Sequence, residues 1–285
     1  MKFSVTSVAI PDLDLPETCR LLAKLGFDGV EWRVRHTPPG AVGKGYSPWG
    51  EHKTDLSPAN ILERADEVRK VTSDHGLEIA AIASSLPATD IEGLKRLAEG
   101  AERLGRVPVR LGAPRGYDRT AGYHELFQET VDAFGRALDL LEPHGVRALA
   151  EIHCGTIFVS ASLAHRVLSR FSPDRVGAIY DINNMCMDGF ETFRIGMELL
   201  GPYLQHVHAG GHIPARKGLR ADGSAEWVWE KCNLQDGLMN LGQFMADLKS
   251  VRYCGYISIE DFRAMDHEAK LRPQIEFLRR LDAGV

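Results

Sequence analysis

Short apolar runs alternate along this chain with longer segments whose apolar residues recur at helical spacing. A run that is apolar throughout, without polar residues at alternate positions, is typical of a strand buried on both faces. Eight such runs occur, at residues 3–9, 28–33, 77–83, 107–112, 146–153, 176–181, 204–209 and 256–260. Eight amphipathic segments follow them, at residues 16–25, 58–75, 91–104, 124–144, 162–171, 192–200, 238–251 and 267–281. The pattern predicts eight consecutive strand–helix pairs.

Residues that start or stop helices support this assignment. Ser57-Pro58 is a helix N-cap followed by proline in the first turn, and His75-Gly76 is typical of a helix C-terminus. Gly26 likewise separates a helical segment from the next run. Strands that alternate with helices form a parallel sheet, either open and doubly wound or closed into a barrel. The count of eight favours closure, so we predict a (β/α)8 TIM barrel.

Length and composition fit one such barrel. The chain has 285 residues, 44% of them hydrophobic, and a (β/α)8 barrel typically uses about 250 residues. No proline- or serine-rich linker and no low-complexity tract marks a boundary. We therefore expect residues 1–285 to form a single TIM barrel domain.

Charge and cysteine content bear on partners and location. The formal net charge is −5, and acidic and basic residues are interleaved, which argues against nucleic-acid binding and against an anionic membrane surface. The five cysteines are scattered without a CxxC pair, as in a protein with reduced thiols. The N-terminus lacks the pattern of a signal peptide, and no apolar run reaches the ~18 residues of a membrane span. We expect a cytoplasmic protein that acts on a small molecule.

Four consecutive strands end in side chains that bind metal ions. They are the fifth to eighth, and the residues are Glu151, Asp181, His208 and Glu260. A buried carboxylate costs several kcal/mol unless it is paired or bound to a metal. The C-terminal ends of parallel strands meet at one mouth of a barrel, where barrel active sites lie. The sequence therefore predicts a site for one divalent ion, with an oxygen and nitrogen donor set that suits Mn²⁺, Mg²⁺, Co²⁺ or Zn²⁺.

Strand alternation refines the choice of histidine. His206 and His208 point to the same face of their strand, and His208 is nearer the mouth. We assign the ligand to His208 and keep His206 as the rival, its alternative role being that of a hydrogen-bonded core residue. His153 shares the parity of Glu151 and is a candidate for contacting substrate or a ligand.

At these residues the chain resembles the sugar phosphate isomerase/epimerase superfamily, the xylose isomerase-like TIM barrels. The resemblance runs nearly end to end and rests on five strings in order. They are Gly26-Phe27-Asp28-Gly29-Val30-Glu31, Glu151-Ile152-His153, Asp181-Ile182-Asn183-Asn184-Met185, His206-Val207-His208 and Gly255-Tyr256-Ile257-Ser258-Ile259-Glu260-Asp261-Phe262. By this resemblance Glu151, Asp181, His208 and Glu260 are the metal ligands, and in the keto-sugar epimerases of the family the matching glutamates also exchange the substrate proton.

The chain departs from those epimerases at two places. Asn184 stands where they have a histidine three residues after the aspartate, and Gly210-Gly211-His212 replaces an acidic residue and a following arginine. Asn184 and His212 are therefore candidate substrate contacts, as is Glu31 at the end of the second strand.

The resemblance implies an isomerase or epimerase for a sugar, keto-sugar or related polyol. A divalent ion would stabilise the enediolate while Glu151 and Glu260 transfer the proton. The same groups would serve a lyase or dehydratase, including one that cleaves a carbon–glycoside bond, and a barrel that has lost catalysis would act as a binding subunit. An abasic-site endonuclease is disfavoured because it needs more histidines, one of them on the third strand, which here has none.

Two long segments, residues 38–53 and 210–237, are expected to be loops that cover the site. They contain Trp49, Trp227 and Trp229, which suit stacking on a sugar, and equally suit buried anchors of the loops or contacts in a homo-oligomer. Loop cations are candidates for holding a phosphate or carboxylate; these are Arg115, Arg119, Arg216, Lys217 and Arg220.

Overall fold

Eight parallel strands close into a barrel in the computed structural model, which describes residues 1–284. Around the barrel they follow the order β1 (Lys2–Thr6), β10 (Tyr256–Ile259), β7 (Leu204–Ala209), β6 (Val176–Asp181), β5 (Ala148–Glu151), β4 (Val109–Leu111), β3 (Glu78–Ala83) and β2 (Gly29–Arg33). The predicted (β/α)8 barrel is thereby confirmed.

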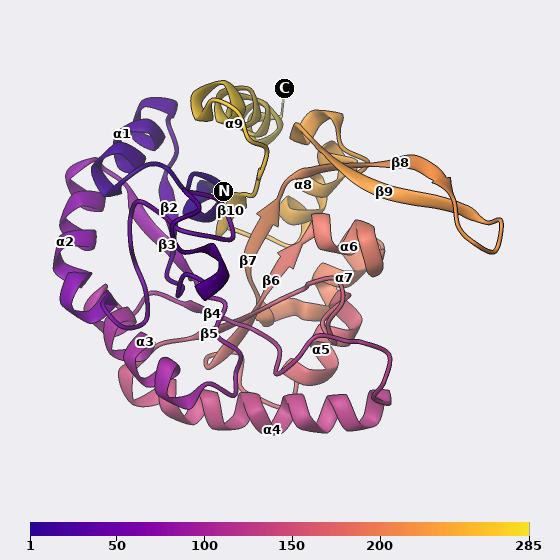
Figure 1. Cartoon of the computed structure of the whole chain (residues 1–285), viewed down its shortest axis with the longest axis horizontal. Helices are drawn as coiled ribbons and strands as arrows, with labels where there is room; N and C mark the ends of the chain where they lie inside the picture. The colour runs from indigo at the N-terminus through magenta and orange to yellow at the C-terminus, as the bar shows by residue number, and fades with distance from the viewer. Residues whose placement is uncertain (285) are drawn as a thin grey trace.

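Helices form the outer ring around the strands (Figure 1). They are α1 (Leu15–Leu25), α2 (Ile61–Asp74), α3 (Ile91–Arg103), α4 (Tyr123–Leu141), α5 (Ala161–Leu168), α7 (Phe193–Leu200), α8 (Leu241–Ser250) and α9 (His267–Ala283). Asp14 caps α1 in a capping box with Glu17, and Gly26 ends this helix at a φ of 79°. In the described part of the chain, no helix has the length and apolar content to cross a membrane.

Strand register sets which side chains share the barrel interior. Ile179 is paired with His206, and Asp181 with His208 two positions further on. Ala81, Leu149 and Ile179 form a small apolar cluster separate from the main core, which packs between the strands and the outer helices. Polar residues with the same parity therefore lie above this cluster, toward the C-terminal mouth.

Several predicted boundaries differ from the structure. The run at residues 3–9 is a strand only to Thr6, because Ser7–Ala9 forms a short 3-10 helix. Helix α2 begins at Ile61 and not at Pro58. Asn60 precedes that helix, and its side chain accepts a hydrogen bond of 2.8 Å from the backbone of Ser57, which holds residues 57–60 in a turn.

Most of the segment at residues 210–237 is a β-hairpin, so its prediction as a loop was wrong. Strands β8 (Gly211–Leu219) and β9 (Ala225–Cys232) pair antiparallel, and the hairpin projects away from the barrel (Figure 1). Most of its residues are partly or fully exposed on both faces, so the alternation of apolar and polar residues that marks a half-buried strand is missing. The segment at residues 38–53 contains a 3-10 turn at Pro39–Ala41 and an isolated β-bridge between Tyr46 and Glu51, and it is otherwise irregular.

Candidate metal centre at the mouth of the barrel

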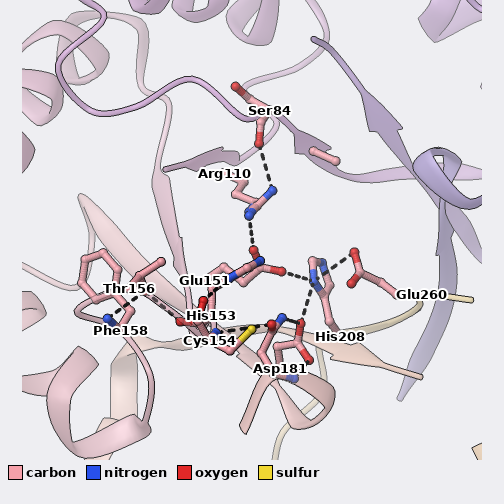
Figure 2. A network of polar contacts seen from close by, with 12 residues as sticks. Ser84, Arg110, Glu151, His153, Cys154, Thr156, Phe158, Asp181, His208 and Glu260 are labelled. Carbon is pink, nitrogen blue, oxygen red and sulfur yellow. Dashed lines mark hydrogen bonds and ion pairs between the residues drawn. The ribbon is translucent and has the colours of Figure 1, made fainter. Parts of the chain in front are cut away.

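The four side chains predicted as ligands converge at the C-terminal mouth (Figure 2). Each of Glu151, Asp181, His208 and Glu260 offers one donor atom, and these atoms all lie within 4.8 Å of one another. Nδ1 of His208 lies 2.9 Å from Oε1 of Glu151, 3.4 Å from Oε1 of Glu260 and 3.9 Å from Oδ2 of Asp181. The structure thus brings together all four residues at one point.

The backbone explains why they meet. Asp181 and His208 are partners in the register of β6 and β7, so both project from the same level of the barrel. Glu260 follows β10, and its backbone N–H donates a hydrogen bond of 2.8 Å to the carbonyl of Ala209. A Cβ atom at Gly210 would lie 2.3 Å from the Glu260 carbonyl oxygen, so only glycine allows this close approach.

A buried glutamate orients the imidazole of His208. Nε2 of His208 lies 3.1 Å from Oε2 of Glu31, whose side chain is fully buried. A hydrogen bond from Nε2–H to this carboxylate leaves Nδ1 directed at the other three carboxylates, where it can bind a metal ion once it has lost its proton. His206 lies one layer deeper, with its Nε2 3.2 Å from the same oxygen of Glu31, and it is not part of the four-residue cluster.

A short helix absent from the sequence prediction fixes Asp181. Helix α6 (Ile182–Asp188) begins directly after this residue, and Oδ1 of Asp181 accepts hydrogen bonds from the backbone N–H groups of Asn183 at 2.7 Å and Asn184 at 3.0 Å. The side-chain amide of Asn184 donates to Oδ2 of Asp181, while its oxygen accepts from the backbone of Cys154 at 3.3 Å. Asn184 therefore locks the aspartate in place.

Arg110 is a site residue that sequence reasoning missed. It lies in the middle of β4, and its guanidinium forms an ion pair with Oε2 of Glu151, while Nη1 donates to the carbonyl of Ser84 at 3.3 Å (Figure 2). A signal was present, because an arginine between the buried residues Val109 and Leu111 of a barrel strand needs an acidic partner. Both oxygens of Glu151 are engaged, one toward His208 and one by Arg110.

The electrostatics of the cluster fit a divalent cation. Burial and the negative charge of Glu151 raise the pKa of Asp181 to about 7. Burial raises the pKa of Glu260 to about 8. The neighbouring carboxylates add to this effect, and His208 opposes it. Burial favours the neutral form of Glu151, but the positive charges of Arg110 and His208 outweigh it. They hold the pKa of Glu151 well below its ordinary value. Three close carboxylates cannot all ionise without added positive charge, which an ion bound to these donors would provide.

We expect the apparent metal affinity to rise with pH. Although burial opposes its charged form, Glu260 and Glu31 raise the pKa of His208 well above its ordinary value, so this residue also holds a proton at neutral pH. Metal ions bind the deprotonated ligands, and each displaced proton raises the association constant about tenfold per pH unit. The increase should be steepest below about pH 7, where Asp181, Glu260 and His208 all hold protons, and it should continue above pH 8 while His208 is still protonated. Titration calorimetry in buffers of different ionisation enthalpy measures this release, and pH-independent affinity without proton release would contradict it.

A cavity of about 330 Å³ opens over the cluster. Glu151 and Glu260 line it, and so do three of the predicted substrate contacts, His153, Asn184 and His212. The fourth predicted contact, Glu31, lies buried beneath the imidazoles. Nδ1 of His153 contacts the carbonyl of Cys154 at 2.7 Å, which leaves Nε2 free for a ligand.

The loop cations named from the sequence lie elsewhere. Arg115 forms ion pairs with Glu125 and Glu129 on α4. Arg216, Lys217 and Arg220 belong to the exposed hairpin or its turn.

The model of the xylose isomerase-like TIM barrel family matches residues 19–281, so the chain belongs to this family. Solved structures with the same fold include a probable 3-DHS dehydratase, AsbF, from Bacillus anthracis, at a TM-score of 0.74 and 16% identity over 98% of this chain and 99% of that one. D-psicose 3-epimerase from Clostridium cellulolyticum H10, solved with D-tagatose, gives 0.71 and 14% over 99% of each chain. The zinc-bound IolI protein gives 0.71 and 17% over 100% and 97%. A search of curated proteins finds no match for this sequence.

Proposed function

We propose that this protein is a divalent-metal-dependent isomerase or epimerase that moves a proton on a sugar, keto-sugar or related polyol. The observation that carries the proposal is the convergence of three carboxylates and one correctly oriented imidazole at the floor of a cavity. Its volume of about 330 Å³ lies at the lower end of the ~300–1,000 Å³ typical of ligand sites, which suits a small sugar derivative.

Glu151, Asp181, His208 and Glu260 would hold the ion. When bound, it supplies Lewis-acid stabilisation for the negative charge that develops on substrate oxygens as the neighbouring carbon loses its proton. The oxygen and nitrogen donors suit Mn²⁺, Mg²⁺, Co²⁺ or Zn²⁺. Glu31 acts through His208 by holding its Nδ1 toward the cluster, and we propose this role for it in place of a substrate contact.

Glu260 is the better placed of the two glutamates to move the proton. Its side chain lines the cavity and is 13% exposed, so its carboxylate can reach the carbon of a bound substrate to accept and return a proton. Glu151 is held as a carboxylate by Arg110, so its second oxygen reaches a substrate carbon only when Arg110 releases it. His153, also in the cavity wall, can position a substrate hydroxyl through its free Nε2.

The contact between Arg110 and Glu151 favours a second candidate function, that of a lyase or dehydratase. An epimerase that inverts a carbon needs a proton carrier on each face, whereas an elimination needs one base and one group that assists departure of a hydroxyl. With Glu151 engaged, Glu260 is the base and His153 is in place to protonate a leaving oxygen. The two functions differ in product, not in the first proton removal.

The deciding experiment measures metal and proton exchange together. Purified protein is analysed for bound metal, reloaded with each of the four ions and incubated in deuterium oxide with a panel of ketoses and keto-acids. We expect one divalent ion per chain and deuterium at one carbon of at least one compound. Inverted product identifies an epimerase, moved carbonyl an isomerase, and loss of water a dehydratase. Full metal loading without exchange in any of these compounds would count against the proposal.

A further inference from the structure

One wall of the cavity consists of two aromatic rings flanked by two cations. The rings of Trp49 and Phe262 lie 5.0 Å apart between their centroids. The guanidinium of Arg35 lies 5.9 Å from the centroid of Trp49, and the ammonium of Lys231 lies 5.6 Å from that of Phe262. We call these four residues the cationic wall, and all of them line the cavity. Aromatic faces attract cations without neutralising them, so both charges persist.

Neither cation of the wall has an acidic partner within residues 1–284. Arg110 pairs with Glu151 and Lys217 pairs with Glu226, but no carboxylate oxygen lies within 4.0 Å of Arg35 or Lys231. Nε of Arg35 donates to the carbonyl of Ala83 at 3.0 Å, which leaves its two terminal nitrogens as donors for a ligand. Burial and Arg110 lower the pKa of Arg35 to about 9, as expected for a guanidinium that lacks a counterion.

The charges of the metal centre do not compensate the wall. With a divalent ion bound, the three carboxylates would carry three negative charges, which the ion and Arg110 together would neutralise. Beneath them, Glu31 and Arg33 are both buried and carry opposite charges. The positive charges of Arg35 and Lys231 are therefore left for a group that enters the cavity.

We propose that the substrate carries a carboxylate or a phosphate, which binds to Arg35 and Lys231 while the reacting end of the molecule faces the metal centre. The inference rests on the proposed function, because it assigns a substrate class to the same site. The two terminal nitrogens of a guanidinium match the paired oxygens of a carboxylate or phosphate. Trp49 and Phe262, between the two cations, offer an apolar surface to the carbon skeleton.

Segments outside the barrel strands supply this wall, so they would set substrate choice. Arg35 follows β2, Trp49 lies in the segment at residues 38–53, and Lys231 lies at the base of the hairpin opposite His212. Burial and the charge of Lys231 lower the pKa of His212, so it faces the cavity as a neutral imidazole that can donate a hydrogen bond.

Anion binding tests the wall directly. Metal-loaded protein is titrated with inorganic phosphate and, separately, with acetate, and binding is followed by calorimetry and by the fluorescence of Trp49. We expect Arg35→Gln to weaken binding roughly 10- to 100-fold, the range for a hydrogen-bonded charge, and Lys231→Gln to weaken it less because Lys231 is exposed. Arg216→Gln and Lys217→Gln remove the same charges from the outer hairpin and should leave the affinity unchanged.

Phosphate can also bind the metal alone, so the effect of Arg35→Gln is decisive. Phosphate affinity that disappears on metal removal but is unchanged in Arg35→Gln would overturn the inference.

A second measurement uses D-fructose, D-fructose 6-phosphate and 5-keto-D-gluconate in deuterium oxide. We expect Arg35→Gln to raise the KM of an anionic compound roughly 10- to 100-fold and to leave that of D-fructose unchanged. An effect confined to the 6-phosphate assigns a phosphate, and one confined to the keto-acid assigns a carboxylate.

The two measurements also separate this inference from the proposed function. Exchange into D-fructose alone, with the same KM in Arg35→Gln, would overturn the anionic substrate and leave the metal-dependent proton transfer standing. Anion binding that depends on Arg35, without exchange in any compound, would support the wall and count against the proposed reaction.

Discussion

Replacing Asp181 or His208 by alanine is expected to abolish stoichiometric metal binding while the barrel stays folded. Each change removes one of four donors that lie within 4.8 Å of one another. The loss should exceed the roughly 10- to 100-fold caused by replacing even an outer partner of a ligand. Elemental analysis of the purified variants and calorimetric titration of metal measure it.

The two variants should differ in stability. The raised pKa of Asp181 means that its ionised form destabilises the metal-free fold. Metal-free Asp181→Ala should therefore lose no more unfolding free energy than the roughly 1 kcal/mol of a helix cap. The loss should become smaller as the pH rises, because Asp181 of the wild type then ionises. His208→Ala leaves Glu31 buried with only His206 as a partner and should melt at a lower temperature.

His206→Ala is the matched control for the choice of histidine. It removes an equally buried imidazole that also contacts Glu31, yet it should keep the metal. Metal lost from His206→Ala alone, or full occupancy in both Asp181→Ala and His208→Ala, would show that the ligands have been wrongly assigned.

The barrel strands could be predicted because burial on both faces leaves a clear mark in the sequence. The predicted runs at residues 176–181 and 204–209 coincide with β6 and β7, whose members are almost all buried. The hairpin was not predicted, because its two strands pair with each other and bury little side-chain surface. Its pairing depends on backbone hydrogen bonds, which place no constraint on side-chain polarity.

The convergence of the four candidate ligands was predictable because an acidic or imidazole side chain at the end of an apolar run is costly without a partner. The partners themselves were harder to find. Glu31 contacts His208 across 177 positions of the chain, and Arg110 reaches Glu151 from the neighbouring strand. Such contacts depend on strand register and on which residues point inward. Helix α6 escaped prediction because its seven residues are too few for a helical period to stand out.

The cationic wall could not be predicted from the sequence either. Lys231 and Arg35 are about two hundred positions apart and come from segments without regular spacing. Only the closed barrel places both beside Trp49 and Phe262. The sequence pointed instead to cations of the outer loops, such as Arg115, which the structure pairs with glutamates of α4.

Replacing Glu260 by glutamine is expected to lower turnover by about 10²- to 10⁴-fold at saturating metal, the contribution usual for a general acid–base group. The amide keeps the shape and an oxygen donor, but it cannot accept the proton. Metal must be saturating because a neutral ligand also binds the ion less tightly. The control is Glu260→Asp, which keeps a carboxylate on a shorter side chain and should retain more activity than Glu260→Gln.

The pattern of deuterium exchange in Glu260→Gln and Glu151→Gln then decides how many groups move the proton. If both glutamates act, as in an epimerase, each single variant should still exchange from one face while failing to invert. If Arg110 keeps Glu151 from acting, Glu260→Gln should lose all exchange, whereas Glu151→Gln should keep it once metal is restored. Arg110→Gln would free Glu151 and should bring its pKa closer to the ordinary value, because the guanidinium holds that pKa down. Wild-type turnover in a protein with glutamine at both positions would exclude either mechanism and leave His153 as the next residue to test as the base.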